Sequence, residues 1–281
     1  MNNLFQVLLV QPILNILVAV YDLLNFLHIS YALGFSIIGL TIIIRLILYP
    51  LTTSQLKTSK KMQELTPHLN RLKEQHKNDS KRLQAETMAL YKEHGVNPAA
   101  GCLPVLIQLP VIWGLYYVLQ HAIVFKLTDV NKLVYFPSLR LQEMWKTVFF
   151  GLSLAHSPAQ IISHTGYLIL LIPVLTGVLQ FLQSKMIMPT RQPSTTQKNG
   201  QDDFTTAFQA QTTFLVPLMI GYFSYSFPIG LSLYWNTLTI FGIIQQYQIH
   251  GLGGLKDLLP TSAVKEEALP LPAPVKKKKK K

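Results

Sequence analysis

The chain has 281 residues, of which 49% are hydrophobic and 14% are charged, whereas about 25% of the residues of a soluble domain are charged. This composition indicates a membrane protein and argues against a soluble enzyme. The formal net charge of +12 must then lie outside the apolar stretches. The single cysteine, Cys102, excludes an internal disulfide, a cysteine-based metal cluster and a pair of redox thiols. The first residues carry no Lys or Arg, so we expect no cleaved secretory signal.

Five stretches are long and apolar enough to cross a membrane, which takes about 20 residues in a helix. We predict transmembrane helices at 29–53, 97–123, 164–186, 207–227 and 228–249. Polar residues interrupt the apolar pattern of 1–28, which predicts an amphipathic helix lying in the membrane interface, with a sixth span as the alternative. The last two spans are separated only by Phe227–Gly230, so we expect them to form a tight helical hairpin.

Basic residues are distributed unevenly over the loops, and cytoplasmic loops are the ones enriched in Lys and Arg. Residues 54–96 hold nine of them, residues 185–203 hold three and the tail from residue 250 holds eight. The opposite side has four, all within 124–163. We therefore place the amino terminus outside and the carboxyl terminus in the cytoplasm.

Residues 54–96 are polar but show a helical pattern, because Met62, Leu65, Leu69 and Leu72 recur at spacings of three and four. We predict a cytoplasmic helical hairpin, with a turn and helix cap at Asn78–Ser80 and a helix end at Gly95. Thr66–Pro67 is expected to kink or restart the first helix, and Asn97–Pro98 to begin the next span. A solvated linker is the alternative for the whole segment. The segment 187–206 is predicted as a second cytoplasmic loop.

The segment 250–281 is predicted to be a disordered basic tail. It passes through the proline-rich Leu269–Pro274 and ends in six consecutive lysines: Lys276, Lys277, Lys278, Lys279, Lys280 and Lys281. Such a block attracts anionic lipids at about 1 kcal/mol per lysine, and it attracts ribosomal RNA through counterion release. Solvation of the chain end is the third possibility.

Arg45 is a charge inside the first span, where burial in lipid costs from about 2.5 to more than 10 kcal/mol. None of the predicted spans contains a carboxylate that could pair with it. Arg45 therefore requires a water-filled cavity, unless its side chain reaches the inner interface about 10 Å away along the helix. The absence of an acid within the spans also argues against a proton-coupled transporter.

Polar residues in the other spans could line such a cavity, although polar residues in spans often only join neighbouring helices. Thr41, Arg45 and Tyr49 share one face of the first span. The other candidates are Gln108 in the second span, Thr176, Gln180 and Gln183 in the third, and Ser232, Tyr234, Trp235, Asn236, Thr239 and Gln246 in the fifth. No phosphate-binding loop, His-Glu-x-x-His or Gly-x-Ser-x-Gly motif occurs, and His121, His156 and His164 lack metal-ligand spacing.

Four segments of the sequence resemble the YidC/Oxa/Alb family of membrane protein insertases. They are Gly34–Ile38 with Thr41–Thr52, Met88–Lys92 with Asn97–Pro98, Gly101–Pro110 with Leu115–Tyr117, and Phe227–Trp235 with Ile243–Gln246. The resemblance extends over residues 10–250. It implies an all-α polytopic membrane protein of the five-span form, with five transmembrane helices around a hydrophilic groove open to the cytoplasm and a cytoplasmic helical hairpin. The outer loop 124–163 matches none of these motifs.

The resemblance implies a function that is not enzymatic and needs no cofactor or metal. Nascent hydrophobic segments would enter the groove from the cytoplasm and leave sideways into the bilayer, alone or with the Sec translocon, in a bacterial cytoplasmic membrane. The groove arginine of the family matches Arg45, and Thr41 and Trp235 match groove positions. Gln180 or Gln183 matches the groove glutamine of the third span. The lysine tail would contact ribosomes or anionic lipids, and a monomer would suffice.

The residues suggest how such a groove would work. Arg45 would hold water within the inner leaflet and attract an acidic outer tail of a substrate, while the apolar segment of the substrate slides between spans three and five into hydrocarbon. A channel or solute carrier that uses the polar residues as a pore is one alternative. A factor that clamps finished membrane complexes is another.

Overall fold

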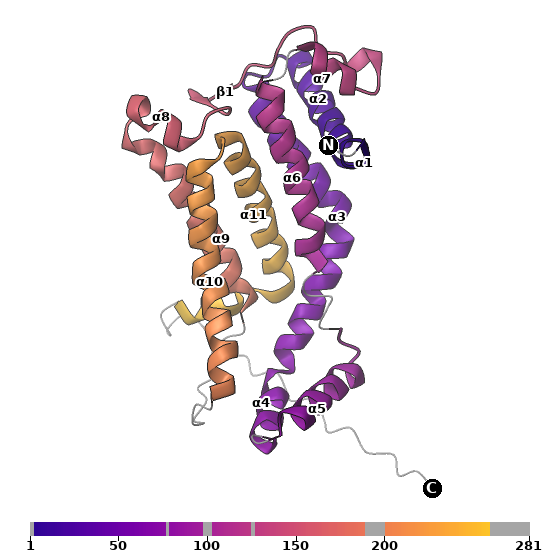
Figure 1. Ribbon diagram of the computed structural model, residues 1–281, viewed down its shortest axis with the longest axis vertical. Helices are drawn as coiled ribbons and strands as arrows, with labels where there is room; N and C mark the ends of the chain where they lie inside the picture. Colours follow the sequence, from indigo (N-terminus) through magenta and orange to yellow (C-terminus); the bar gives the residue numbers. More distant parts are fainter. Residues whose placement is uncertain (1–2, 77–78, 98–102, 125–126, 189–199, 259–281) are drawn as a thin grey trace.

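The computed structural model describes residues 3–76, 79–97, 103–124, 127–188 and 200–258 (Figure 1). The described chain is almost entirely helical. Its elements are α1 (Asn3–Phe5), the π-helical turn η1 (Gln6–Val10), α2 (Gln11–Phe26), α3 (Ala32–Glu64), α4 (Thr66–Gln75), α5 (Ser80–Glu93), α6 (Leu103–Val124), α7 (Leu127–Leu133), η3 (Pro137–Leu139), β1 (Val148–Phe149), β2 (Leu152–Ser153), α8 (Pro158–Thr165), η4 (Tyr167–Leu170), α9 (Leu171–Ile187), α10 (Gly200–Ser226), α11 (Ile229–His250) and η5 (Gly253–Leu258).

The amino-terminal helix packs into the bundle instead of standing apart from it. Leu14, Leu17 and Val18 of α2 are almost completely buried and belong to the same apolar cluster as Ile37 and Leu40 of α3. Gly114 of α6 lets Ile13 approach so closely that a Cβ at that glycine would meet its side chain at 2.8 Å. The first helix therefore braces α3 and α6.

Three helices among the described residues are long and apolar enough to cross a membrane: Gln6–Phe26, Ala32–Glu64 and Tyr167–Ile187. Gln108–Leu119 and Thr213–Ser226 are shorter apolar helical stretches. The interfacial placement of residues 1–28 and the count of five spans both stay predictions.

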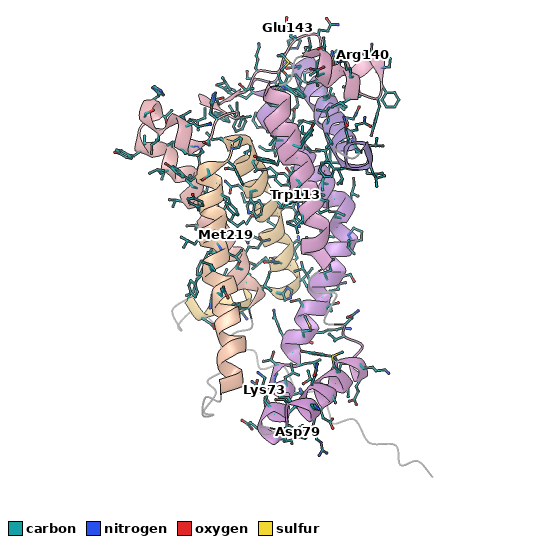
Figure 2. The ribbon with its side chains drawn as sticks, in the orientation of Figure 1. Lys73, Asp79, Trp113, Arg140, Glu143 and Met219 are labelled. Atoms are coloured by element: carbon teal, nitrogen blue, oxygen red, sulfur yellow. The ribbon has the colours of Figure 1, made fainter. Side chains whose placement is uncertain are left out.

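The helical hairpin predicted at residues 54–96, which we call the basic hairpin, begins as a continuation of α3. The sequence placed a boundary at residue 53, but α3 runs unbroken to Glu64. The chain breaks at Leu65 and restarts at Thr66–Pro67, because proline is accommodated in the first turn of a helix. Asp79 caps α5 by accepting a hydrogen bond from the backbone N–H of Arg82 at 3.0 Å, and Gly95 follows the helix with φ +63°. Lys73 and Asp79 lie at the far tip of this hairpin (Figure 2).

Helices α9, α10 and α11 form the second half of the bundle. Two glycines, Gly177 of α9 and Gly221 of α10, face each other so closely that a Cβ at Gly221 would lie 3.6 Å from the Cα of Gly177. Small residues at such crossings allow membrane helices to pack backbone to backbone. Helix α10 begins at Gly200, seven residues before the predicted span, and only Phe227 and Pro228 separate it from α11.

The outer loop closes one end of the bundle. The first two N–H groups of α11 bond to this loop, with Ile229 donating to the carbonyl of His156 and Gly230 to that of Leu154, both at 3.0 Å. The open N–H groups at the start of a helix need such acceptors when they are buried. Phe149 covers Gly34 at the start of α3, where any Cβ would overlap its ring.

Side-chain contacts to helix ends join α3, α9 and α11 at the opposite end. Gln63 bonds the carbonyl of Ile187, and Lys60 bonds that of Ile249 at 3.1 Å. His250, one residue beyond the predicted fifth span, has its pKa lowered by burial and by the charge of nearby Lys60. Pro98 of the predicted cap, Asn78, Cys102 and the lysine tail lie outside the described residues.

Candidate functional site

Arg45 lies between α3 and α11 and binds a backbone carbonyl instead of a carboxylate. Its Nη2 donates to the carbonyl oxygen of Leu238 at 2.9 Å, and its guanidinium carbon is 6.0 Å from the centre of the Phe241 ring. The ion pairs found among the described residues, Lys132–Asp129 and Lys185–Asp257, do not include it. The charge is therefore uncompensated by any described acid, as the sequence predicts.

Gly242 makes this contact possible. The carbonyl of Leu238 is the helical acceptor for the N–H four residues later, which is that of Gly242. A Cβ on Gly242 would lie 3.3 Å from Nη2 of Arg45 and would overlap the amide of Gln183. Because Gly242 has no side chain, Arg45 of α3 and Gln183 of α9 can both approach the same turn of α11. We call Arg45, Gln183, Leu238, Phe241 and Gly242 the arginine cluster.

A second polar contact also joins α9 and α11. It lies about one turn from Gln183 along α9 and about two turns from Gly242 along α11. The indole N–H of Trp235 donates to Oε1 of Gln180 at 3.0 Å. Gln180 and Gln183, which the sequence could not distinguish, therefore both face α11, with different partners. Thr41 is fully buried on α3, but its hydroxyl donates to the carbonyl of Ile37 within its own helix at 2.6 Å.

Tyr234 connects α11 to α6. It is fully buried, and its hydroxyl accepts a hydrogen bond of 2.6 Å from the amide of Gln108. Among the described residues, the buried atoms Oδ1 of Asn236, Nε of Arg45 and Oε1 of Gln246 have no hydrogen-bond partner. Buried polar atoms of this kind are normally satisfied by protein or water.

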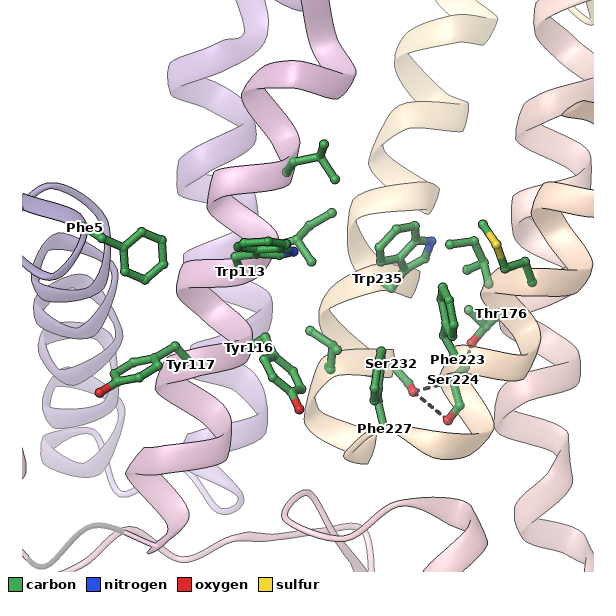
Figure 3. A pocket seen from close by; sticks show the side chains of 15 residues that line it. Phe5, Trp113, Tyr116, Tyr117, Thr176, Phe223, Ser224, Phe227, Ser232 and Trp235 are labelled. Atoms are coloured by element: carbon green, nitrogen blue, oxygen red, sulfur yellow. Dashed lines mark hydrogen bonds between the residues drawn. The ribbon is translucent and has the colours of Figure 1, made fainter. Parts of the chain in front are cut away.

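Three hydroxyls join α9, α10 and α11 nearer the outer loop. Ser224 lies 3.1 Å from the hydroxyl of Thr176 and 2.8 Å from that of Ser232, and all three residues are buried. This network fixes the turn between α10 and α11 against α9. It also borders a cavity (Figure 3).

The cavity has a volume of about 630 Å³ and lies between α6 on one side and α10 and α11 on the other. Its walls are mostly aromatic and aliphatic, with Trp113 and Tyr116 from α6, Phe223 and Phe227 from the α10 end, and Trp235 from α11 (Figure 3). Trp113 is 68% exposed. We call this space the apolar cavity; Trp235 lines it and also bonds Gln180.

The structure brings some of the predicted groove residues together and separates others. Arg45, Gln183, Gln180 and Trp235 gather along one side of α11. Gln108 and Tyr234 form a separate pair, and the hydroxyl of Thr41 bonds within its own helix. The passage predicted between spans three and five stays a prediction; in this structure α9 and α11 pack directly together, and the open apolar surface lies between α6 and α10. Sequence reasoning missed Gly242, whose position among bulky residues of a span was the available signal.

Comparisons of this sequence with known proteins all indicate the same family. The sequence profile described as "60Kd inner membrane protein" matches residues 23–253. The membrane protein insertase MisCA of Bacillus subtilis is 36% identical, over 78% of this chain and 70% of its own length. The membrane protein insertase YidC of Fusobacterium nucleatum is 35% identical, over 77% of this chain and 85% of its own.

A chloroplast relative and a solved structure agree with this family. The inner membrane protein ALBINO3 from chloroplasts of Arabidopsis thaliana is 34% identical over 87% of this chain, and the chain spans about half the length of this relative. A crystal structure of an active YidC insertase with its first transmembrane domain resolved aligns with a TM-score of 0.55 at 25% identity, over 84% of this chain and 46% of the other. The chain belongs to the 60Kd inner membrane protein family, the YidC/Oxa/Alb family that its motifs resemble, and it is a multi-pass membrane protein.

Proposed function

We propose that this protein is a membrane protein insertase, which receives nascent hydrophobic segments from the cytoplasm and releases them sideways into the bilayer. The observation that carries the proposal is Arg45, a cation inside a bundle of apolar helices whose described partner is the carbonyl of Leu238. A charge is costly in this position and marks a functional site in membrane proteins. The names of the bacterial relatives support the same activity.

The arginine cluster would supply the polar part of the pathway. Nε of Arg45 is a buried polar atom with no partner among the described residues, and water can satisfy it. Hydration here would lower the cost of bringing the polar tail of a substrate below the level of the lipid head groups. The charge would attract an acidic tail by about 4 kcal/mol at a separation of 4 Å and an effective dielectric constant near 20.

The apolar cavity would supply the hydrophobic part of the pathway. Its aromatic walls from α6 and α10 offer an apolar segment contacts that resemble the hydrocarbon it is about to enter. A segment that rests there needs no ATP to proceed, because transfer into lipid is itself favourable. Gln108 and Tyr234 join α6 to α11, and Trp235 joins α11 to α9; these contacts would position the helices beside the pathway.

The proposal also includes the orientation of the protein in the membrane and its partners. The protein would lie in a bacterial inner membrane with its amino terminus outside and its carboxyl terminus in the cytoplasm. The α4–α5 hairpin and the lysines Lys276–Lys281 would face the cytoplasm, where they would meet ribosomes, the Sec translocon or anionic lipids. Because one chain would hold one complete groove, a monomer would be active.

Reconstitution tests the proposal directly. Purified protein in lipid vesicles is given a small single-span substrate with an acidic outer tail, and insertion is measured by protection of the tail from protease. We expect insertion well above that of protein-free vesicles, a loss in Arg45→Ala, and wild-type activity in the matched control Arg140→Ala on the outer loop. Equal protection with and without the protein would contradict an autonomous insertase.

A further inference from the structure

The outer loop divides into a charged half and an uncharged half. Between residues 127 and 146 it carries Asp129, Lys132, Arg140, Glu143 and Lys146. No Lys, Arg, Asp or Glu then occurs until Lys185, a stretch that includes the β1–β2 hairpin, α8, η4 and α9 as far as Ser184. Figure 2 shows Arg140 and Glu143 at the outermost end of the molecule.

The uncharged half exposes large apolar side chains. Phe150 at the tip of the β1–β2 hairpin is 66% exposed, and Tyr167 and Leu168 of η4 are 83% and 78% exposed. Phe150 has a positive φ of +46° and is followed by Gly151 at +82°, so the tight turn presents its ring outward. We call the β1–β2 hairpin, α8 and η4 the outer shelf.

The shelf is firmly attached to the bundle, so its exposed side chains are held in place. The ring of Phe149 packs against Phe35 with centroids 5.4 Å apart, and the ring of Phe150 lies 4.9 Å from that of Tyr31. Ser157 caps α8 in a reciprocal arrangement with Gln160. Helix α8 projects sideways beside α10 at the end of the bundle (Figure 1).

The exposed surface of the shelf runs directly into the lipid-facing side of α9. Leu168, Leu171, Leu175 and Val178 follow one another at helical spacing, and the last three are 64%, 51% and 50% exposed. The helical stretch that is apolar enough to cross a membrane begins at Tyr167 itself. The residues just before Tyr167 must therefore lie where hydrocarbon gives way to water.

We propose that the outer shelf is a membrane-interface anchor, which seats Phe150, Tyr167 and Leu168 among the head groups of the leaflet opposite the basic hairpin. Aromatic side chains favour this zone. The exposed side chains of α8, such as Gln160, Ser163 and His164, are polar and carry no fixed negative charge. The charged half of the loop would stand above the head groups in water.

Site-directed fluorescence measures this placement. On a Cys102→Ser background, single cysteines replace Phe150, Leu168, Glu143 or Val174, and each is labelled with nitrobenzoxadiazole. The full-length variants are reconstituted into vesicles of phosphatidylcholine and phosphatidylglycerol. Quenching by aqueous iodide is compared with quenching by nitroxides attached to the lipid head group or to the middle of the acyl chain.

We expect the labels at positions 150 and 168 to be quenched most by head-group nitroxide and several-fold less by iodide than the label at position 143. The label at position 174 should respond to the acyl-chain nitroxide and so calibrate the hydrocarbon. Iodide quenching at 150 and 168 equal to that at 143 would overturn the proposal. Shielding of both positions from iodide and from every lipid nitroxide would also overturn it, because a protein would then cover the shelf.

Position 168 keeps the test valid if Phe150→Cys fails to fold, since Leu168 is one of the most exposed side chains of the shelf. Its substitution removes little packing. The result is independent of insertase activity, because it reports only where the shelf lies in the bilayer.

Discussion

The arginine cluster and the apolar cavity are built in opposite ways. The cluster lies where α3, α9 and α11 pack closely, and its charge is held by a backbone carbonyl at 2.9 Å. The cavity lies where α6 and α10 stand apart, and its aromatic walls include Trp113, which is 68% exposed. The polar side chains of the arginine cluster are thus enclosed between closely packed helices, whereas the apolar side chains of the cavity face an open side of the bundle.

This difference implies a division of labour between the two regions. Enclosure raises the strength of an electrostatic interaction because it lowers the local dielectric constant. An open apolar wall accepts segments of varied sequence because burial of apolar surface is not directional. Changes to the cluster should therefore act according to substrate charge, and changes to the cavity should act on all substrates alike.

Removing Tyr234 should have the largest effect, because it is a fully buried aromatic side chain that joins α11 to α6. The side chain is fully buried and accepts the hydrogen bond of Gln108. Tyr234→Ala leaves a large cavity and should lower the free energy of unfolding by about 3–5 kcal/mol, judged from core aromatic substitutions. Detergent-induced unfolding measures it. Tyr234→Phe serves as the control and should lose only about 1 kcal/mol; equal losses would place the effect in the hydrogen bond alone.

Filling the glycine position should damage the arginine cluster selectively. A leucine in place of Gly242 would displace the amide of Gln183 and the guanidinium of Arg45. We expect a destabilisation of about 1–3 kcal/mol, as for other overpacked sites, and a greater loss of insertion for acidic-tailed than for neutral-tailed substrates. Ile244→Leu on the exposed side of α11 is the matched control. A uniform loss across substrates would argue against a role specific to charge.

Truncating Trp113 should weaken the apolar cavity without changing its charge preference. Trp113→Ala removes apolar contact area from the cavity wall, and we expect insertion rates to fall about fivefold, or ~1 kcal/mol, for acidic and neutral tails alike. Leu215→Ala, at a lipid-exposed position of α10, is the control. If only acidic-tailed substrates were affected, the proposed separation of the two regions would be wrong.

The hydroxyl network should have the smallest effect. Ser224→Ala removes the hydroxyl between Thr176 and Ser232. Hydrogen bonds between membrane helices contribute about 0.6 kcal/mol on average, so the variant should lose about that amount per bond and keep its insertion activity. A loss of insertion at unchanged stability would show that these hydroxyls take part in the pathway.

Much of this arrangement follows from sequence patterns, and the exceptions have physical causes. Apolar length located the helices, and the lack of a carboxylate in any span singled out Arg45. The hydrogen-bond partner of Arg45 could not be predicted from the sequence, because every residue has a backbone carbonyl. Only the close packing at Gly242 brings the carbonyl of Leu238 within reach of the guanidinium. The end of the first span at residue 53 stays a prediction, and the helix itself continues to Glu64, because a helix need not stop at the edge of its apolar stretch.

The position of the open side could not be predicted, since hydropathy says which residues favour lipid but not which helices stand apart. Polar residues of α9 join it to α11, through the Gln180–Trp235 hydrogen bond and the close approach of Gln183 to Gly242. The roles of Arg45, Thr41, Gln108, Gln180, Gln183, Tyr234, Trp235 and Asn236 in insertion stay predictions.

The most direct test of the central claim combines the charge of Arg45 with that of the substrate. Single-span substrates with acidic, neutral or basic outer tails are offered to vesicles containing wild-type protein, Arg45→Ala or Arg45→Lys. The account predicts that wild type favours the acidic tail, that Arg45→Lys keeps this preference and that Arg45→Ala abolishes it. The same order of preference in all three proteins would contradict an electrostatic role for Arg45.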